Sequence, residues 1–252
     1  MFATATGTAM RWLRSQVAHA QTVTSSPGVP RAAVAGAVAG AVNGAVDGHH
    51  QPDVRAFAPG GEQFHQPDQT TCGSSSLVMA RMINDPAYGE TILAPNDDGS
   101  TDLIAVTERF DQAVLAMHRL TSGWRDGGGT WQLPWPAQLG TPPWAVARQM
   151  SADGGSGTPS TEYRARLIDP AQLGPTYDAI VGAVDAGQCV PLFIGDDLMA
   201  RHVVLVTGHT AGGLSIYDPS CGEWVPASRD AYLDGNIDVA GWGPPWFVVT
   251  PA

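Results

Sequence analysis

The sequence of 252 residues contains no lysine, so arginine supplies all 13 of its basic side chains, against 24 aspartates and glutamates. The formal net charge is −11 at pH 7, and basic residues form no cluster. Because nucleic-acid phosphates are bound by clustered basic side chains, this composition argues against a nucleic-acid partner. The missing lysines, together with abundant Ala and Gly, are typical of a bacterial genome rich in G and C.

Cysteine is also scarce. The three cysteines, Cys72, Cys189 and Cys221, are too few for a disulfide framework in a chain of this length. Cys189 lies in an apolar run and is predicted to be a core residue, whereas Cys221 is either a bystander in a turn or a second reactive thiol. No pair of cysteines has metal-ligand spacing, so neither a metal nor another cofactor is expected.

No apolar run is long enough to cross a membrane. The longest, at 32–42, is well short of the ~20 residues that a bilayer span needs. It belongs to an Ala-Val-x-Gly repeat over 33–48, which is typical of a flexible linker of low complexity. Glycine at every fourth position also permits close helix packing, so membrane contact through 32–48 is a less favoured alternative. We predict a flexible tail at 1–52 and a globular domain at 53–252.

The N-terminal region is a poor secretory signal. Ala18-His19-Ala20 resembles a cleavage site, but Arg11 and Arg14 interrupt the region where the apolar stretch should lie. The compartment therefore stays open between the bacterial cytoplasm and export by a route without a typical signal.

The segment around Cys72 carries the strongest functional signal. Cys72-Gly73 is followed by three serines and by apolar residues at helical spacing over 77–83. This pattern predicts that Cys72 lies in the first turn of a buried helix. The unpaired backbone N–H groups and the helix dipole would there stabilise a thiolate, which is the nucleophilic form of cysteine. Gly73 has no side chain to obstruct an approaching carbonyl.

A base for this thiol is predicted at His202, which opens the apolar run 202–207, typical of a buried strand. The next predicted strand, 213–218, ends at Asp218, and positions 214, 216 and 218 share one face. Because a short Gly-rich turn separates the two strands, antiparallel pairing would bring the carboxylate next to the imidazole. Six positions before Cys72, the amide of Gln66 could bind the same carbonyl oxygen as the Cys72 N–H.

This combination resembles the double-glycine (bacteriocin-processing) peptidases and their stand-alone relatives within the papain-like clan. The resemblance is strongest over 63–83 and 187–220. It implies Cys72 as nucleophile, His202 as base, Asp218 as the residue that orients the base, and Gln66 as oxyanion donor. Transporter-linked members continue into membrane helices and a nucleotide-binding domain, but this sequence shows neither a long span nor a Walker-type loop. The resemblance therefore implies the thiol chemistry of the family more strongly than its substrate, a leader peptide cleaved after Gly-Gly.

The remaining pattern predicts an α+β fold, with helices first and an antiparallel sheet afterwards. The resemblance implies the papain-like form, in which a helical lobe with the cysteine at a helix start packs on a sheet that carries the histidine and aspartate. Residues 122–160, dense in Gly, Pro and Trp, are predicted to form an insertion that covers the substrate, or else a Trp-filled extension of the core. The predicted helices are 101–118 and 170–186, and the further strands are 163–168, 189–194 and 245–250.

The sequence therefore predicts a bacterial cysteine peptidase that cleaves a peptide or protein substrate by thiolate acyl transfer. Three alternatives stay open. The acyl group could be passed to an amine, as in transglutaminase-like or arylamine acetyltransferase-like proteins. The same cleft could serve an inactive binding module, or the catalytic unit could be an exported toxin that uses the N-terminal tail to reach a membrane.

Overall fold

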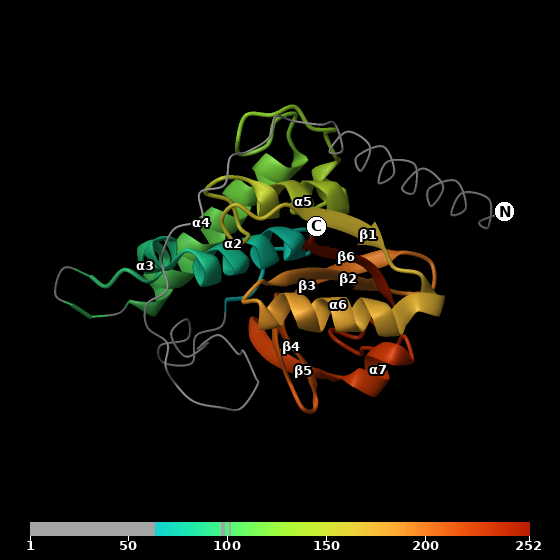
Figure 1. Cartoon of the computed structure of the whole chain (residues 1–252). Helices are drawn as coiled ribbons and strands as arrows, with labels where there is room; N and C mark the ends of the chain where they lie inside the picture. The colour runs from blue at the N-terminus through green and yellow to red at the C-terminus, as the bar shows by residue number, and fades with distance from the viewer. Residues whose placement is uncertain (1–63, 97–98, 101) are drawn as a thin grey trace, which may run out of the picture.

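A six-stranded antiparallel sheet forms the centre of the structure (Figure 1). This computed structural model describes residues 64–96, 99–100 and 102–252, so the predicted tail at 1–52 and its repeat lie outside the described residues. The strand order is β1-β6-β2-β3-β4-β5, and every neighbouring pair is antiparallel. The strands are β1 (Tyr163–Leu167), β2 (Val190–Gly195), β3 (Ala200–Thr210), β4 (Gly213–Asp218), β5 (Glu223–Ser228) and β6 (Pro245–Pro251).

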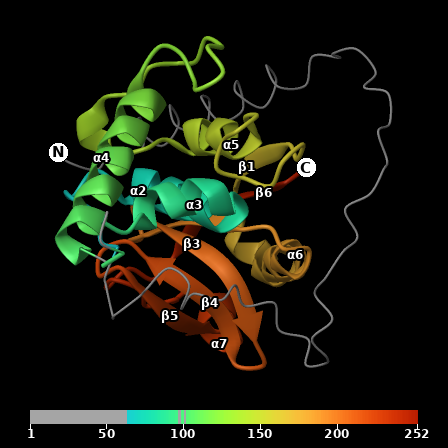
Figure 2. The same ribbon diagram turned by 90° about the vertical axis from the view of Figure 1, so that its left-hand side faces the viewer.

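Helices cover both faces of this sheet (Figures 1 and 2). The helices on one face come mostly from the N-terminal half of the described chain, which confirms the predicted α+β class. On that face lie α2 (Cys72–Asn84), α3 (Pro86–Leu93), α4 (Leu103–Ser122) and α5 (Pro143–Ser151), while α6 (Leu173–Asp185) and α7 (Arg229–Leu233) pack on the other.

β3 shows how the sheet separates two cores. Because side chains alternate along a strand, Val203 and Leu205 enter the core shared with α2, α4 and α5. Val204 and Val206 enter the core shared with α6 and α7. Burial on both faces explains why this strand reads as a continuous apolar run, and it confirms the buried strand predicted at 202–207.

The predicted helix at 101–118 is α4, with shifted ends. Asp102, inside the predicted range, is the N-cap, since its carboxylate accepts hydrogen bonds from the N–H groups of Ile104 and Ala105. The helix continues to Ser122. The second predicted helix begins as a 3-10 turn at Pro170–Gln172, capped by Asp169, before α6 proper.

Residues 122–160 divide into two parts. The second part contains α5, whose Trp144 is 5% exposed and belongs to the helical-side core. In the first part, Trp124 and Trp131 are more than half exposed, at 64% and 58%. The stretch between Trp131 and α5 carries Trp135, whose ring packs edge-on against Trp144 with 5.2 Å between ring centroids.

Candidate active site

Cys72 is the first residue of α2 and is 6% exposed. α2 runs through the middle of the helical layer, where it packs against β3, α3, α4 and α5. The N-cap residue Thr71 makes no side-chain capping bond, because its hydroxyl donates to the carbonyl of Asp68 instead (2.9 Å). The first-turn N–H groups therefore stay available to a negative charge at the helix start, as the sequence predicted.

His202 and Asp218 form a buried pair across β3 and β4. His202 Nε2 lies 2.7 Å from Asp218 Oδ1, and both side chains are less than a tenth exposed. The register pairs Leu205 with Tyr217, which places Asp218 on the stretch of β4 beside the start of β3. Figure 2 shows α2 crossing the same face of these strands.

Ser220 completes the surroundings of this carboxylate. Its N–H donates to Asp218 Oδ1 and its hydroxyl donates to Asp218 Oδ2, each at 2.9 Å. Burial would raise the pKa of Asp218, but the hydrogen bonds from His202 and Ser220 and the charge of His202 hold that pKa below its usual value. Asp218 therefore stays ionised and acts on the imidazole as a fixed anion.

The imidazole of His202 links Asp218 to the thiol. Burial favours neutral His202, yet hydrogen bonds to Asp218 and Cys72 and the negative charges of these two groups raise the pKa of His202 to about 9. Because Nε2 faces Asp218, Nδ1 is the nitrogen available to Cys72. At neutral pH this arrangement favours an imidazolium at His202.

Gln66 is placed in the segment that leads to Cys72 and is tied to the end of β4. Its backbone N–H donates to the carbonyl of Pro219 (2.7 Å), and the Tyr217 hydroxyl donates to the carbonyl of Phe64. Gln66 Nε2 donates to the Asp68 carbonyl (2.8 Å), while its buried Oε1 has no hydrogen-bond partner among the described residues. Since an amide nitrogen carries two hydrogens, the bond to Asp68 fixes the group and leaves one N–H for another acceptor.

A cavity of about 460 Å³ opens beside Cys72 and His202. Gln66 is not among its lining residues, whereas Gln69 and Thr70 are. Most of the lining is apolar, and much of it comes from residues 135–143, within the segment predicted to cover the substrate. Gln69, Thr70 and Ser220 could not be predicted from the sequence, because their positions depend on a turn and on a strand end that have no periodic signature.

Gly73 is needed for a reason other than the predicted one. A Cβ added at Gly73 would lie 2.7 Å from Thr141 Cβ, so the space beside it is filled by Thr141 rather than kept open for a carbonyl. Thr141 Oγ1 also lies 3.1 Å from the buried hydroxyl of Ser74. Gly73 therefore allows the segment that carries the cavity wall to pack directly on the start of α2.

The other two cysteines differ from Cys72 in their surroundings. Cys189 is 2% exposed, and burial raises the pKa of its thiol to about 12, as suits the predicted core residue. Cys221 is half-buried, and its pKa is raised by burial and by the charge of Asp218. Its thiol thus lacks the cationic partner that Cys72 has, which favours the bystander over a second reactive thiol.

Within the described ranges, no group of three or more His, Cys, Asp or Glu could hold a metal ion. The part of the chain that the structure describes also contains no helix long and apolar enough to cross a membrane. Comparison of the sequence with protein-family models and with curated proteins found no match.

Proposed function

We propose that the protein is a papain-like cysteine peptidase that uses Cys72, His202 and Asp218. The observation that carries this proposal is the buried contact chain from the carboxylate through the imidazole to a thiol at a helix start. A buried charged pair costs desolvation energy, and apolar side chains of similar volume would often stabilise a fold as well, so its presence beside a cavity is better explained by chemistry. The antiparallel sheet bearing His202 and Asp218, packed against the helix that begins at Cys72, supports the papain-like form.

The reaction begins when the Cys72 thiolate attacks a peptide carbonyl carbon, and the charge moves to the carbonyl oxygen. The Cys72 N–H donates to that oxygen, and we assign the second donor to the remaining N–H of Gln66, which lies in the segment leading to Cys72 but outside the cavity lining. His202 then gives its proton to the departing amine as the carbon–nitrogen bond breaks, which leaves an acyl group on Cys72 Sγ. In the second step His202 takes a proton from water, the hydroxide attacks the acyl carbon, and the thiolate is released.

The chain offers an internal control for a test of the thiol. Wild-type protein would be treated with limiting iodoacetamide at pH 6, and modification of each cysteine would be followed by peptide mapping. We expect Cys72 to be modified at least about tenfold faster than the more exposed Cys221, because an imidazolium stabilises its thiolate. The variant His202→Gln should lose this advantage. Equal rates at the two cysteines would contradict the proposal.

Hydrolysis is tested separately with a peptide library, in which wild type is compared with Cys72→Ala. New peptide termini should appear only with wild type. Transfer of the acyl group to an added amine, with no hydrolysis, would instead favour the acyltransferase.

A further inference from the structure

The cavity beside Cys72 has apolar surfaces from two separate parts of the chain. The sheet supplies Phe193 of β2 together with Trp246 and Phe247 of β6. The segment between α4 and α5 supplies Trp135 and Leu139. Aromatic rings of this size offer a large apolar surface, which suits an apolar group of a substrate.

Charge in the cavity is nearly neutralised. Apart from His202, Arg201 is the only charged residue among the described residues that line the cavity, and its Nε donates to Asp196 Oδ2 at 2.9 Å. The indole N–H of Trp246 donates to the backbone carbonyl of the same residue, Asp196, at 2.9 Å. The carboxylate of Asp196 therefore offsets the charge of Arg201, and the N–H of Trp246 is already used, so its ring adds apolar surface to the cavity.

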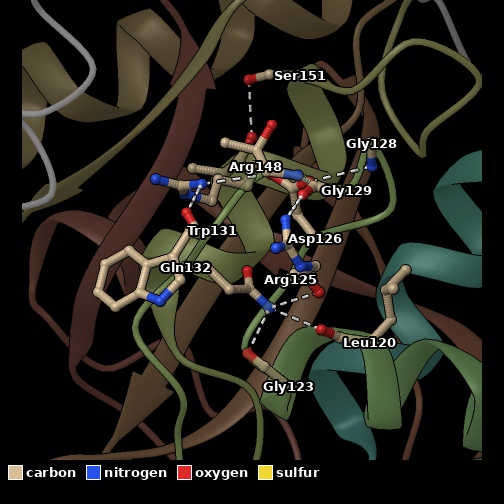
Figure 3. Close-up of polar contacts among 12 residues, drawn as sticks. Leu120, Gly123, Arg125, Asp126, Gly128, Gly129, Trp131, Gln132, Arg148 and Ser151 are labelled. Carbon is tan, nitrogen blue, oxygen red and sulfur yellow. Dashed lines mark hydrogen bonds and ion pairs between the residues drawn. The ribbon is translucent and has the colours of Figure 1, made fainter.

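The stretch between α4 and Trp135, which leads into this wall of the cavity, is fixed by polar contacts (Figure 3). Gln132 is fully buried, and its Nε2 donates to the carbonyls of Leu120 (2.7 Å) and Gly123 (3.1 Å) at the end of α4. Arg148 of α5 donates to the Trp131 carbonyl (2.9 Å) and pairs with Asp126. These contacts hold the chain immediately before Trp135, so the cavity is preformed, which lowers the cost of binding an apolar group.

We infer that this cavity binds a bulky, uncharged apolar side chain in the acyl part of the substrate, within one residue of the scissile bond. The inference rests on the proposed peptidase function and names its substrate class: peptides with a large apolar residue before the cleavage site, rather than a glycine pair. The acyl part stays attached to Cys72 through both steps, so a side chain held there contributes to each of them. Burial of one such side chain corresponds to about a tenfold to hundredfold gain in specificity.

The test uses N-acetyl dipeptidyl acyloxymethyl ketones, which alkylate a catalytic thiolate and carry their side chains on the acyl side. Five probes are compared: Gly-Gly, Phe-Gly, Gly-Phe, Glu-Gly and Gly-Glu. We expect one Phe probe to inactivate Cys72 about ten to a hundred times faster than Gly-Gly, and its Glu counterpart to show no gain. Gly-Gly or a Glu probe that reacts as fast as both Phe probes would overturn the inference.

Two exposed aliphatic residues, Leu139 and Ile104, provide matched variants. Leu139 lines the cavity and is 64% exposed, whereas Ile104 on α4 is 73% exposed and lies outside the cavity lining. Leu139→Asp should remove most of the advantage of the Phe probe, and Ile104→Asp should keep it. A Phe advantage unchanged by Leu139→Asp would show that the cavity is not its source.

Iodoacetamide separates failure of this inference from failure of the peptidase proposal. It carries no side chain, so it should modify Cys72 equally in wild type and in Ile104→Asp. If iodoacetamide reacts with Cys72 and the Phe probes show no advantage, only the substrate class is wrong. If neither reagent prefers Cys72 over Cys221, the proposed function fails and the inference fails with it.

Discussion

Asp218→Asn removes the anion that supports His202 while nearly preserving the shape of the side chain. The pKa of His202 is raised from the usual 6.5 to about 9, against the effect of burial, by Asp218 and Cys72 together. At 1.36 kcal/mol per pKa unit, the whole increase is worth roughly 3 kcal/mol. Since Cys72 supplies part of it, we expect the variant to lower the pKa of His202 by about 1 to 2, roughly 1 to 3 kcal/mol.

The pKa can be measured directly by NMR titration of the imidazole carbon-bound protons, with His202→Gln used to assign the signal. Activity provides a second readout, because the proposed reaction needs a protonated His202 to release the amine. Wild-type kcat/KM should fall as pH rises through about 9, and in Asp218→Asn this alkaline fall should begin at lower pH.

A matched control joins the same strand, β3, to the end of α6. His209 Nε2 and Asp185 Oδ1 are also 2.7 Å apart, but Asp185 is half exposed and neither residue lines the cavity. Asp185→Asn should leave both the His202 titration and the alkaline fall unchanged. A His202 that titrates near 6.5 in wild type, or near 9 in Asp218→Asn, would refute the reasoning.

Three further outcomes are expected. Gln66→Ala should lower kcat by about 10² to 10³, the usual effect of losing one oxyanion donor, while alkylation of Cys72 by iodoacetamide continues; an unchanged kcat would exclude the role of Gln66. Gly73→Ala should lower the free energy of unfolding in urea by about 1 to 3 kcal/mol, because the added Cβ would overlap Thr141. Adding Thr141→Gly to this variant should restore part of the loss. The His202 charge should stabilise the fold fully below pH 6.5 and cease to do so as pH rises through about 9, so the free energy of unfolding should decline over that window in wild type and much less in Asp218→Asn.

Elements with a strong internal pattern could be predicted from the sequence. α4 follows from its helical spacing, and β3 and β4 follow from β-branched runs separated by a Gly-rich turn. The position of Cys72 at a helix start follows from small residues that precede an apolar stretch. The approach of Asp218 to His202 was also predictable, because a short turn forces neighbouring strands to pair.

Elements that depend on distant partners were missed. β5 is an edge strand that is mostly exposed and contains Pro226, so it lacks both an apolar alternation and a full set of N–H donors. α5 lies in a segment dominated by Gly, Pro and Trp, and it is defined by burial of Trp144 and Met150 against the rest of the helical-side core. Neither element carries its own signal in the sequence.

The sequence by itself determined the class of fold and the candidate reacting side chains, because helix starts, strand periodicity and residue chemistry are local properties of the chain. Only the tertiary structure decided that Ser220 supports Asp218, that Thr141 fills the space beside Gly73, and that Trp135 and Leu139 face the cavity at Cys72. These contacts join segments that are distant in sequence or lie at strand ends, where the packing of whole elements sets the geometry. For function, the local sequence pattern predicts a thiol reaction, whereas the class of substrate is inferred from a cavity that exists only in the folded chain.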